Sequence, residues 1–275
     1  MSTRLHISMW LLCLAGAGVA EAASGVARPV KFRLLAGTPV VDGVYLNGRG
    51  PYRFLIDTGS QRSRISQKLA EELEWKASFR TRIITQTDEK MRDGFRVESV
   101  RLGDVETAND EFVAASLGAI QELDPAIRGF LGQSFLRKLD YLIDYRHKEL
   151  KFGTATVRGG VKASFGLSHG CMVTETSQGQ LTLDSGATTV VLYDASDVQW
   201  KGQLAVHTTE GEARVRFGEL RSLRVAGQEF RNVEAAESAR RKFDATDTDG
   251  LLPARLFSSL YVSNSGGYVV FNPQQ

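Results

Sequence analysis

Cysteine and histidine are scarce in this chain. Of its 275 residues only two are cysteines, Cys13 and Cys171, and four are histidines. Because Cys13 lies in a segment that we expect to be removed, Cys171 stands alone and no intramolecular disulfide can form. A structural zinc site needs about four nitrogen or sulfur ligands, which this chain does not supply in one place. We therefore expect no metal and no cofactor, and we interpret Cys171 as a buried or partly exposed strand residue.

Proline, net charge and long apolar runs are limited as well. The chain has 6 prolines, and its 34 basic residues nearly balance 32 acidic ones. A nearly neutral chain lacks the strong field expected of a nucleic-acid partner. After the N-terminal segment no apolar run approaches the ~20 residues of a membrane span. A hydrophobic content of 42% can nevertheless fill a large core, and 275 residues suggest two folding units.

The N-terminal segment has the pattern of an export signal. Arg4 and His6 precede an apolar run over residues 7–19, and Ala20-Glu21-Ala22 places small residues before a cleavage position. This pattern predicts a signal peptide over residues 1–22 and an exported protein, periplasmic or secreted. The alternative is a signal that is retained as an anchor.

Short strands dominate the rest of the sequence. Alternating or apolar runs separated by Gly, Asp or Asn predict strands over 40–46, 52–56, 81–85, 95–102, 141–145 and 150–152. Residues 47–50 (NGRG) are typical of a hairpin turn between the first two strands. Helical periodicity is confined to residues 66–75 and a shorter stretch at 133–139. The sequence therefore predicts an all-β protein with few helices.

An internal repeat divides the chain into two halves. The sequence FLIDTGS at 54–60 has a counterpart in LTLDSGA at 181–187, and GFLGQSFL at 129–136 has one in GLLPARLF at 250–257. Residues 100–115 likewise match 223–236, so the features recur in the same order at nearly constant spacing. We predict two homologous lobes, an N-terminal lobe over 23–155 and a C-terminal lobe over 156–275.

Each lobe contains an apolar strand followed by Asp, Thr or Ser, Gly, and Ser or Ala. The strand carries a carboxylate into a partly buried turn, where ionisation is costly. Glycine permits a close approach that a side chain would prevent, and the hydroxyl can bond to the other lobe. If the lobes meet by pseudo-two-fold symmetry, two carboxylates face each other and share one proton. Such a pair can activate a water and protonate a carbonyl oxygen, which is metal-free amide hydrolysis.

At these residues the chain resembles the pepsin/retropepsin-like aspartic peptidases over nearly all of its expected mature length. The family signature is an apolar pair, then D-T/S-G-S/T/A, and later two apolar residues and a glycine. The resemblance implies two acid-protease β-barrel lobes with a cleft between them, and Asp57 and Asp184 as the catalytic dyad. The expected supporting residues of the dyad loops are Thr58, Gly59, Ser60, Ser185, Gly186, Ala187 and Gly132. Pro253 departs from the pattern, because a glycine is expected at its position.

The resemblance also implies β-hairpin flaps over the cleft. The candidates are residues 84–95 in the first lobe and 206–215 in the second, although neither carries the tyrosine expected at the flap of pepsin-like enzymes. The alternative is that both are plain surface hairpins. Arg62 and Arg64 follow the first aspartate and could select acidic substrates, but a surface salt bridge is the preferred interpretation.

Two other motifs carry less weight. Residues 244–250 resemble a calcium loop, yet the required ligand positions hold Ala245 and Leu256. Residues 132–136 (GQSFL) begin like a nucleophile elbow but lack its final glycine. Neither motif is interpreted as a site.

Together these patterns predict an exported, monomeric aspartic endopeptidase with a compact bilobal architecture. Its partner would be a polypeptide substrate bound extended in the inter-lobe cleft, with no nucleic acid and no membrane span in the mature chain. The alternative is a catalytically inactive peptide- or partner-binding module on the same fold, which the departure at Pro253 would favour.

Overall fold

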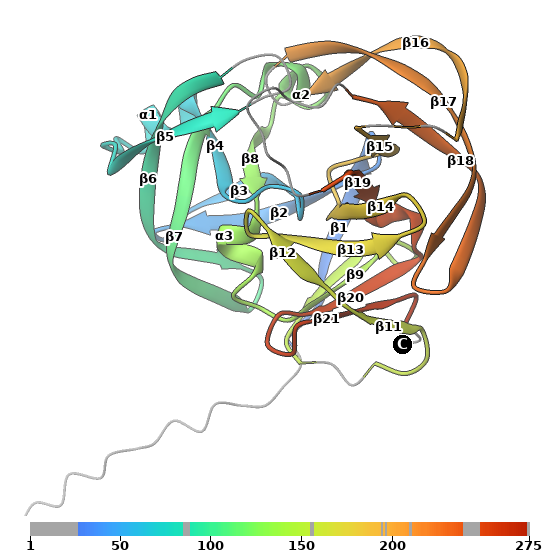
Figure 1. Ribbon diagram of the computed structural model, residues 1–275. Coiled ribbons are helices and arrows are strands. Elements are labelled where there is room, and N and C mark those ends of the chain that lie inside the picture. Colours follow the sequence, from blue (N-terminus) through green and yellow to red (C-terminus); the bar gives the residue numbers. More distant parts are fainter. Residues whose placement is uncertain are drawn as a thin grey trace, which may run out of the picture.

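The computed structural model describes residues 27–84, 89–154, 157–193, 195, 197–208, 211–238 and 248–273. Strands make up most of this part of the chain, and three short α-helices accompany them (Figure 1). The N-terminal half forms one lobe, drawn in blue and green, and most of the C-terminal half forms the other, in yellow to red (Figure 1). The predicted all-β fold with two lobes is confirmed, whereas the expected signal peptide at 1–22 lies outside the described residues.

The larger sheet begins with C-terminal strands and ends in the N-terminal lobe. Its 13 strands are, in spatial order, β11 (Val161–Ser164), β21 (Tyr268–Phe271), β20 (Ser259–Ser263), β9 (Tyr141–Asp144), β10 (Glu149–Phe152), β1 (Val30–Leu35), β2 (Thr38–Leu46), β3 (Arg49–Ile56), β8 (Ile127–Leu131), β4 (Ser63–Ser66), β7 (Val105–Ala115), β6 (Glu89–Leu102) and β5 (Phe79–Ile84).

The smaller sheet belongs to the C-terminal lobe. Its 8 strands are β12 (Gly166–Ser168), β13 (Cys171–Thr176), β14 (Gly179–Asp184), β19 (Gly250–Pro253), β15 (Val190–Leu192), β18 (Gln228–Glu237), β17 (Gly211–Val225) and β16 (Val198–Thr208). The helices are α1 (Gln67–Glu72), α2 (Gly118–Leu123), α3 (Gln133–Leu136) and the 3-10 turn η1 (Ala254–Leu256).

Helix α1 is shorter than the 66–75 stretch that the sequence predicted. Ser66 caps its N-terminus, because the Ser66 hydroxyl accepts a hydrogen bond from the Leu69 N–H at 3.1 Å. Glu74 then adopts a left-handed conformation with φ of 57°, which ends the helix before Trp75. Trp75 still packs against the core beside Phe95. The apolar pattern over 66–75 therefore indicated which residues are buried, but not where the helix ends.

The repeat appears in the strand register as well as in the sequence. In the first lobe β3 runs parallel to β8, with Phe54 opposite Gly129. In the second lobe β14 runs parallel to β19, with Leu181 opposite Gly250. These partners are the same positions of the two sequence repeats, so the hydrophobic pattern places both aspartate strands in the same register.

A shared sheet joins the lobes beneath the two aspartate strands. Strands β1, β10 and β9 come from the first lobe, β20, β21 and β11 come from the second, and β9 pairs with β20 (Figure 1). Leu142 lies directly opposite Tyr261, and the two occupy equivalent positions at the ends of the lobes. The pseudo-two-fold axis therefore passes between them. The predicted lobe boundary at 155/156 falls outside the described residues.

One cluster of buried apolar side chains runs through both lobes and the shared sheet. Phe54 and Phe112 fill it in the first lobe, and Phe257 and Phe271 fill it where the second lobe meets the shared sheet. Such a continuous core holds the two aspartate strands in one rigid frame, because close-packed interiors resist displacement.

Candidate active site

The two aspartates stand at the ends of equivalent strands. Asp57 follows β3 directly, and its backbone N–H donates to the Leu131 carbonyl at 3.0 Å. Asp184 is the last residue of β14 and lies opposite Pro253 in the parallel pair with β19. Each aspartate therefore leaves its sheet beside the apolar strand that the sequence repeat placed downstream of it.

Thr58 and Ser185 hold the two loops against each other. The Thr58 hydroxyl donates to the Leu183 carbonyl at 2.8 Å, and the Ser185 hydroxyl donates to the Ile56 carbonyl at 2.7 Å. Each hydroxyl also accepts the backbone N–H of the other residue, at 3.0 Å from Thr58 and 2.9 Å from Ser185. All four bonds are buried and cross between the lobes. The structure thus brings together the two residues that the sequence assigned to bracing the loops.

Gly59 and Gly186 let the two carboxylates approach. A Cβ atom at Gly59 would lie 2.4 Å from Cγ of Asp184, and one at Gly186 would lie 3.1 Å from Oδ1 of Asp57 and 3.2 Å from Oδ1 of Asp184. Any side chain at Gly59 would occupy the space of the Asp184 carboxylate. The close approach of the loops, rather than an unusual backbone torsion, therefore requires glycine there.

The surroundings of the two carboxylates differ. Ser60 donates its hydroxyl to Oδ2 of Asp57 at 2.7 Å, and the Gly59 N–H donates to Oδ1 at 3.1 Å. Asp184 accepts backbone N–H groups, from Gly186 at 2.7 Å and from Ala187, and shares a side-chain hydrogen bond with Asp57. Asp57 is half-buried, whereas Asp184 is 9% exposed.

Burial raises the pKa of Asp184 well above its usual range, and the neighbouring charge of Asp57 raises it further. The N–H groups of Gly186 and Ala187 oppose this shift, because they stabilise the ionised carboxylate. The arrangement favours one proton on the pair, resting on Asp184, with the charge on Asp57 where Ser60 donates to it.

The loop behind Asp57 is braced by polar groups. The Gly132 N–H donates to the Ser63 hydroxyl at 3.0 Å, and the Ser134 hydroxyl donates to the Glu111 carbonyl at 2.8 Å. A Cβ at Gly132 would lie 2.7 Å from the Arg62 carbonyl oxygen, so this expected supporting residue has no room for a side chain.

The second lobe replaces that brace with apolar groups. Pro253 occupies the position of Gly132, and Val190, which is fully buried, occupies the position of Ser63. Proline has no N–H to satisfy, and valine has no hydroxyl to accept one. The departure at Pro253 is therefore matched by a second substitution, and Pro253 itself is buried in β19.

Gln133 is a supporting residue that sequence reasoning missed. Its side-chain amide donates to the Thr58 carbonyl at 2.8 Å, and it is 1% exposed. The signal was present in GQSFL, where a polar pair interrupts an apolar run just after the loop glycine. Gln133 and Ser134 are buried and hold the loop by hydrogen bonds, so GQS has a structural role and is no nucleophile elbow.

The candidate flaps form β-hairpins in both lobes. Strands β5 and β6 pair from Phe79 opposite Gly94 onward, and β16 and β17 pair with an irregularity between Trp200 and Gly202. Residues 85–88 and 209–210 at their turns lie outside the described residues. Arg62 pairs with Glu111 at 2.8 Å, which agrees with the salt-bridge interpretation.

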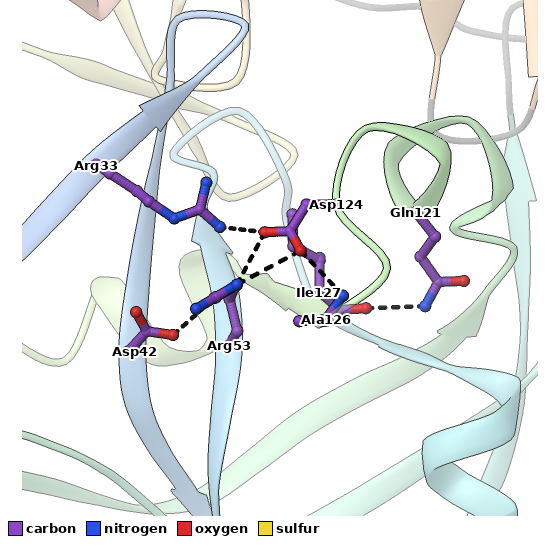
Figure 2. A network of polar contacts seen from close by, with 7 residues as sticks. All are labelled: Arg33, Asp42, Arg53, Gln121, Asp124, Ala126 and Ile127. Atoms are coloured by element: carbon purple, nitrogen blue, oxygen red, sulfur yellow. Dashed lines mark hydrogen bonds and ion pairs between the residues drawn. The ribbon is translucent and has the colours of Figure 1, made fainter.

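Helix α2 was not predicted, and it lies against both lobes. Ile120 packs on a small apolar cluster that includes Val40 and Leu55, and the helix also lies beside β16 and β17 (Figure 1). Asp124, which caps the C-terminus of the helix, accepts hydrogen bonds from two arginines and from a backbone N–H, those of Arg33, Arg53 and Ala126 (Figure 2). Although burial opposes the shift, these donors lower the pKa of Asp124. The network fixes the end of α2 to the first lobe.

The remaining candidate sites give no cluster of metal ligands. Cys171 begins β13 and is 7% exposed, which confirms the strand-cysteine interpretation. Within the described residues no three His, Cys, Asp or Glu side chains gather as a metal site would require. Residues 244–247 of the calcium-like motif lie outside those residues. In the same part of the chain, no helix has the length and apolar character needed to cross a bilayer.

Comparisons with known proteins match part of the chain. No curated protein matches the chain. A solved retropepsin-like aspartic protease from Rickettsia conorii matches it at 21% identity and a TM-score of 0.35, covering 45% of this chain and 87% of that one. The family model of the aspartyl proteases matches residues 43–135, a span that includes Asp57 and Gly132. Over those residues the first lobe is therefore similar to the aspartyl proteases, and the matched span contains the first aspartate and the glycine of the downstream apolar strand.

Proposed function

We propose that the protein is an aspartic endopeptidase with Asp57 and Asp184 as its catalytic pair. The single observation that carries this proposal is the cross-lobe arrangement of Thr58 and Ser185, which sets both carboxylates side by side. The similarity of residues 43–135 to the aspartyl proteases supports a peptidase function in general. The different surroundings of the two carboxyl groups suggest their roles: Asp57, which accepts from Ser60, acts as the base, and the buried Asp184 acts as the acid.

In the proposed reaction a water lies between the two carboxyl groups. Asp57, ionised, takes a proton from the water, whose oxygen attacks the carbonyl carbon of the peptide bond. Asp184 gives its proton to the carbonyl oxygen, so a neutral tetrahedral diol forms. Collapse of the diol returns one proton to Asp184 and passes the proton held by Asp57 to the leaving nitrogen, as the C–N bond breaks. Proton transfer thus balances without a metal.

The proposal includes the substrate and the compartment. An extended polypeptide would lie between the lobes and add strand-like hydrogen bonds to the hairpins β5–β6 and β16–β17. Export through the signal at residues 1–22 would place a monomeric enzyme in the periplasm or outside the cell. Cell fractionation of the full chain and of a variant lacking those residues tests export, and light scattering of the purified protein tests the monomer.

Cleavage of casein or of a peptide library by the purified protein tests the activity. We expect turnover that Asp57→Ala abolishes and that Asp42→Asn leaves unchanged, because the Asp42 side chain is 66% exposed on the surface and pairs with Arg53. A protein that binds peptides with both aspartates intact but cuts none would instead be the inactive binding module. Turnover that survives in Asp57→Ala would overturn the assignment of the pair.

A further inference from the structure

Two equivalent turns lie beside the aspartate loops of the opposite lobes. Ala36 and Gly37, with φ of 46° and 92°, precede β2, while His169 and Gly170, with φ of 48° and 78°, precede β13. A Cβ at Gly170 would lie 3.5 Å from Cγ of Gln61 in the first aspartate loop. The turn before β2 correspondingly lies beside Thr188 of the second aspartate loop. The spacing between these two turns differs from that between the other repeated features, so the sequence repeat does not show that the turns are equivalent.

The residue after each turn donates a hydrogen bond across the lobes. The Thr38 hydroxyl donates to the Gly186 carbonyl at 3.2 Å, and the Cys171 thiol donates to the Gly59 carbonyl at 3.3 Å. Both donors are 7% exposed. Each lobe therefore holds the carbonyl of the glycine that follows the aspartate of the other lobe. The two donors differ in strength, because a thiol is a weak donor and a hydroxyl is a good one.

The peptide group that Thr38 holds is connected to the Asp184 carboxylate. The Gly186 carbonyl and the Ala187 N–H belong to one peptide unit, and that N–H hydrogen-bonds to the carboxylate of Asp184. A donor at the carbonyl end polarises the unit and strengthens the bond at the N–H end. The Thr38 hydroxyl is therefore coupled to the ionised form of Asp184.

The peptide group that Cys171 holds has a different partner. The Gly59 carbonyl and the Ser60 N–H form one unit, and this N–H donates to the backbone carbonyl of Asp57 at 3.3 Å. Asp57 takes its carboxylate donor from the Ser60 hydroxyl instead. The thiol thus shapes the loop without a direct link to a carboxylate.

We propose that Thr38 and Cys171 are a cross-lobe pair of positioning residues, in which Thr38 stabilises the ionised form of Asp184 and Cys171 orients only the loop after Asp57. This inference rests on the proposed function for its catalytic meaning, although the coupling of Thr38 to Asp184 does not. Ala187 offers the Asp184 carboxylate no hydroxyl donor. In this proposal the Thr38 hydroxyl of the other lobe supplies that support through the Gly186–Ala187 peptide group.

The buried thiol and the buried phenols beside the dyad keep their protons between mildly acidic and neutral pH. Burial raises the pKa of Cys171 to about 12, and the charges of Asp57 and Asp184 act in the same direction, so the thiol keeps its proton. Burial likewise raises the pKa of Tyr141 and of Tyr145, which face Cys171 and Asp184 respectively.

The test compares variants of Thr38 and Cys171 by carboxyl ¹³C NMR titration and by the pH profile of kcat/KM. Thr38→Val removes the hydroxyl at nearly constant volume. We expect the titration of Asp184 and the alkaline limb of the profile to move upward by about half a pH unit, with kcat about threefold lower, the order of one hydrogen bond. Thr38→Ser should match the parent, and Thr38→Cys should give a smaller shift. Cys171→Ala should lower kcat while leaving both titrations in place.

An Asp184 titration that is unchanged in Thr38→Val would overturn the coupling, as would an equal shift in Thr38→Ser, since that would reflect packing. If Thr38→Val does not fold, the comparison of Thr38→Cys with Thr38→Ser decides the same question. The NMR measurement also separates the two proposals. A chain that cuts no peptide but shows the shift refutes the peptidase proposal alone, and a chain that cuts peptides without the shift refutes only the coupling.

Discussion

The two lobes hold their equivalent aspartates with different side chains. In the first lobe the Ser60 hydroxyl donates to Asp57, and the Gly132 N–H donates to the Ser63 hydroxyl behind the loop. The second lobe has Ala187, Val190 and Pro253 at the corresponding positions and relies on apolar packing and backbone N–H groups. The comparison teaches that the two loops can keep the same backbone arrangement with different side chains around them. This difference in side chains determines which of the two carboxyl groups holds the proton.

The largest effect should come from removing one carboxylate. Asp57→Asn and Asp184→Asn should each lower kcat about 10³-fold or more, because neither remaining carboxyl can both accept and donate the required protons. The double variant should be little worse than either single one, since groups that act as a unit are not additive. Steady-state kinetics on one peptide measures this. A single variant with more than a tenth of the parent activity would contradict a shared mechanism.

The next effect concerns the positions where the lobes differ most. Gly132→Ala should destabilise the protein by about 1–3 kcal/mol, because its Cβ would meet the backbone carbonyl of Arg62 at 2.7 Å. The matched Pro253→Ala should change the free energy of unfolding by less than about 1 kcal/mol, since that position already holds a Cβ. Urea denaturation of both variants checks the difference.

Exchanging the braces sharpens the same comparison. Ser63→Val should leave the buried Gly132 N–H without an acceptor and cost about 1–3 kcal/mol. Val190→Ser should also destabilise, because Pro253 offers no N–H to the new hydroxyl. If Val190→Ser were as stable as the parent, the second loop would not be the apolar counterpart of the first.

A smaller effect concerns stability against pH. Because the pKa of Asp184 is raised in the folded protein, folding retains a proton that the unfolded chain releases, and stability falls as pH rises above the unfolded value of about 4. Asp184→Asn removes this dependence, so it should gain on the order of 1 kcal/mol relative to the parent between pH 4 and pH 7. Thermal unfolding at several pH values measures the gain. A constant difference between the two proteins would show that Asp184 titrates normally.

The smallest effect should come from exchanging the hydroxyl beside each carboxylate. Ala187→Ser would give Asp184 a donor, lower its pKa and move the kcat/KM profile toward lower pH by about half a unit. Ser60→Ala should move the profile upward, because Asp57 loses its 2.7 Å bond. The parent should have a mildly acidic optimum, since one proton must remain on the pair. An optimum near pH 2, or a profile that Ala187→Ser leaves in place, would refute this assignment.

Much of the site around the two carboxylates could be predicted from local chemistry. One apolar strand ending in Asp-Thr-Gly is a weak motif, but two such motifs, each with its downstream apolar partner inside a repeat, are specific enough to name Asp57 and Asp184. Repetition of that motif also predicted that the two lobes would meet at these loops. Pro253 looked like a defect from the sequence, because its compensation by Val190 requires knowing that the two strands are neighbours. Helix α2 escaped prediction because only six residues, beginning with glycine, form it.

The sequence by itself determined the all-β class, the two-fold repeat and the identity of the paired aspartates, because strand periodicity and a short motif are local properties of the chain. The tertiary structure decided which side chains support each carboxylate. Thr38, Cys171 and Gln133 act on loops that are distant in sequence or cross from the other lobe. Thr38 and Cys171 reach the loops of the opposite lobe only after β9 and β20 pair and bring the halves together, whereas Gln133 reaches Thr58 within the first lobe. No sequence pattern indicates either approach. Burial of Asp184 is likewise a consequence of that pairing, and it places the proton on one of two aspartates that look equivalent in sequence.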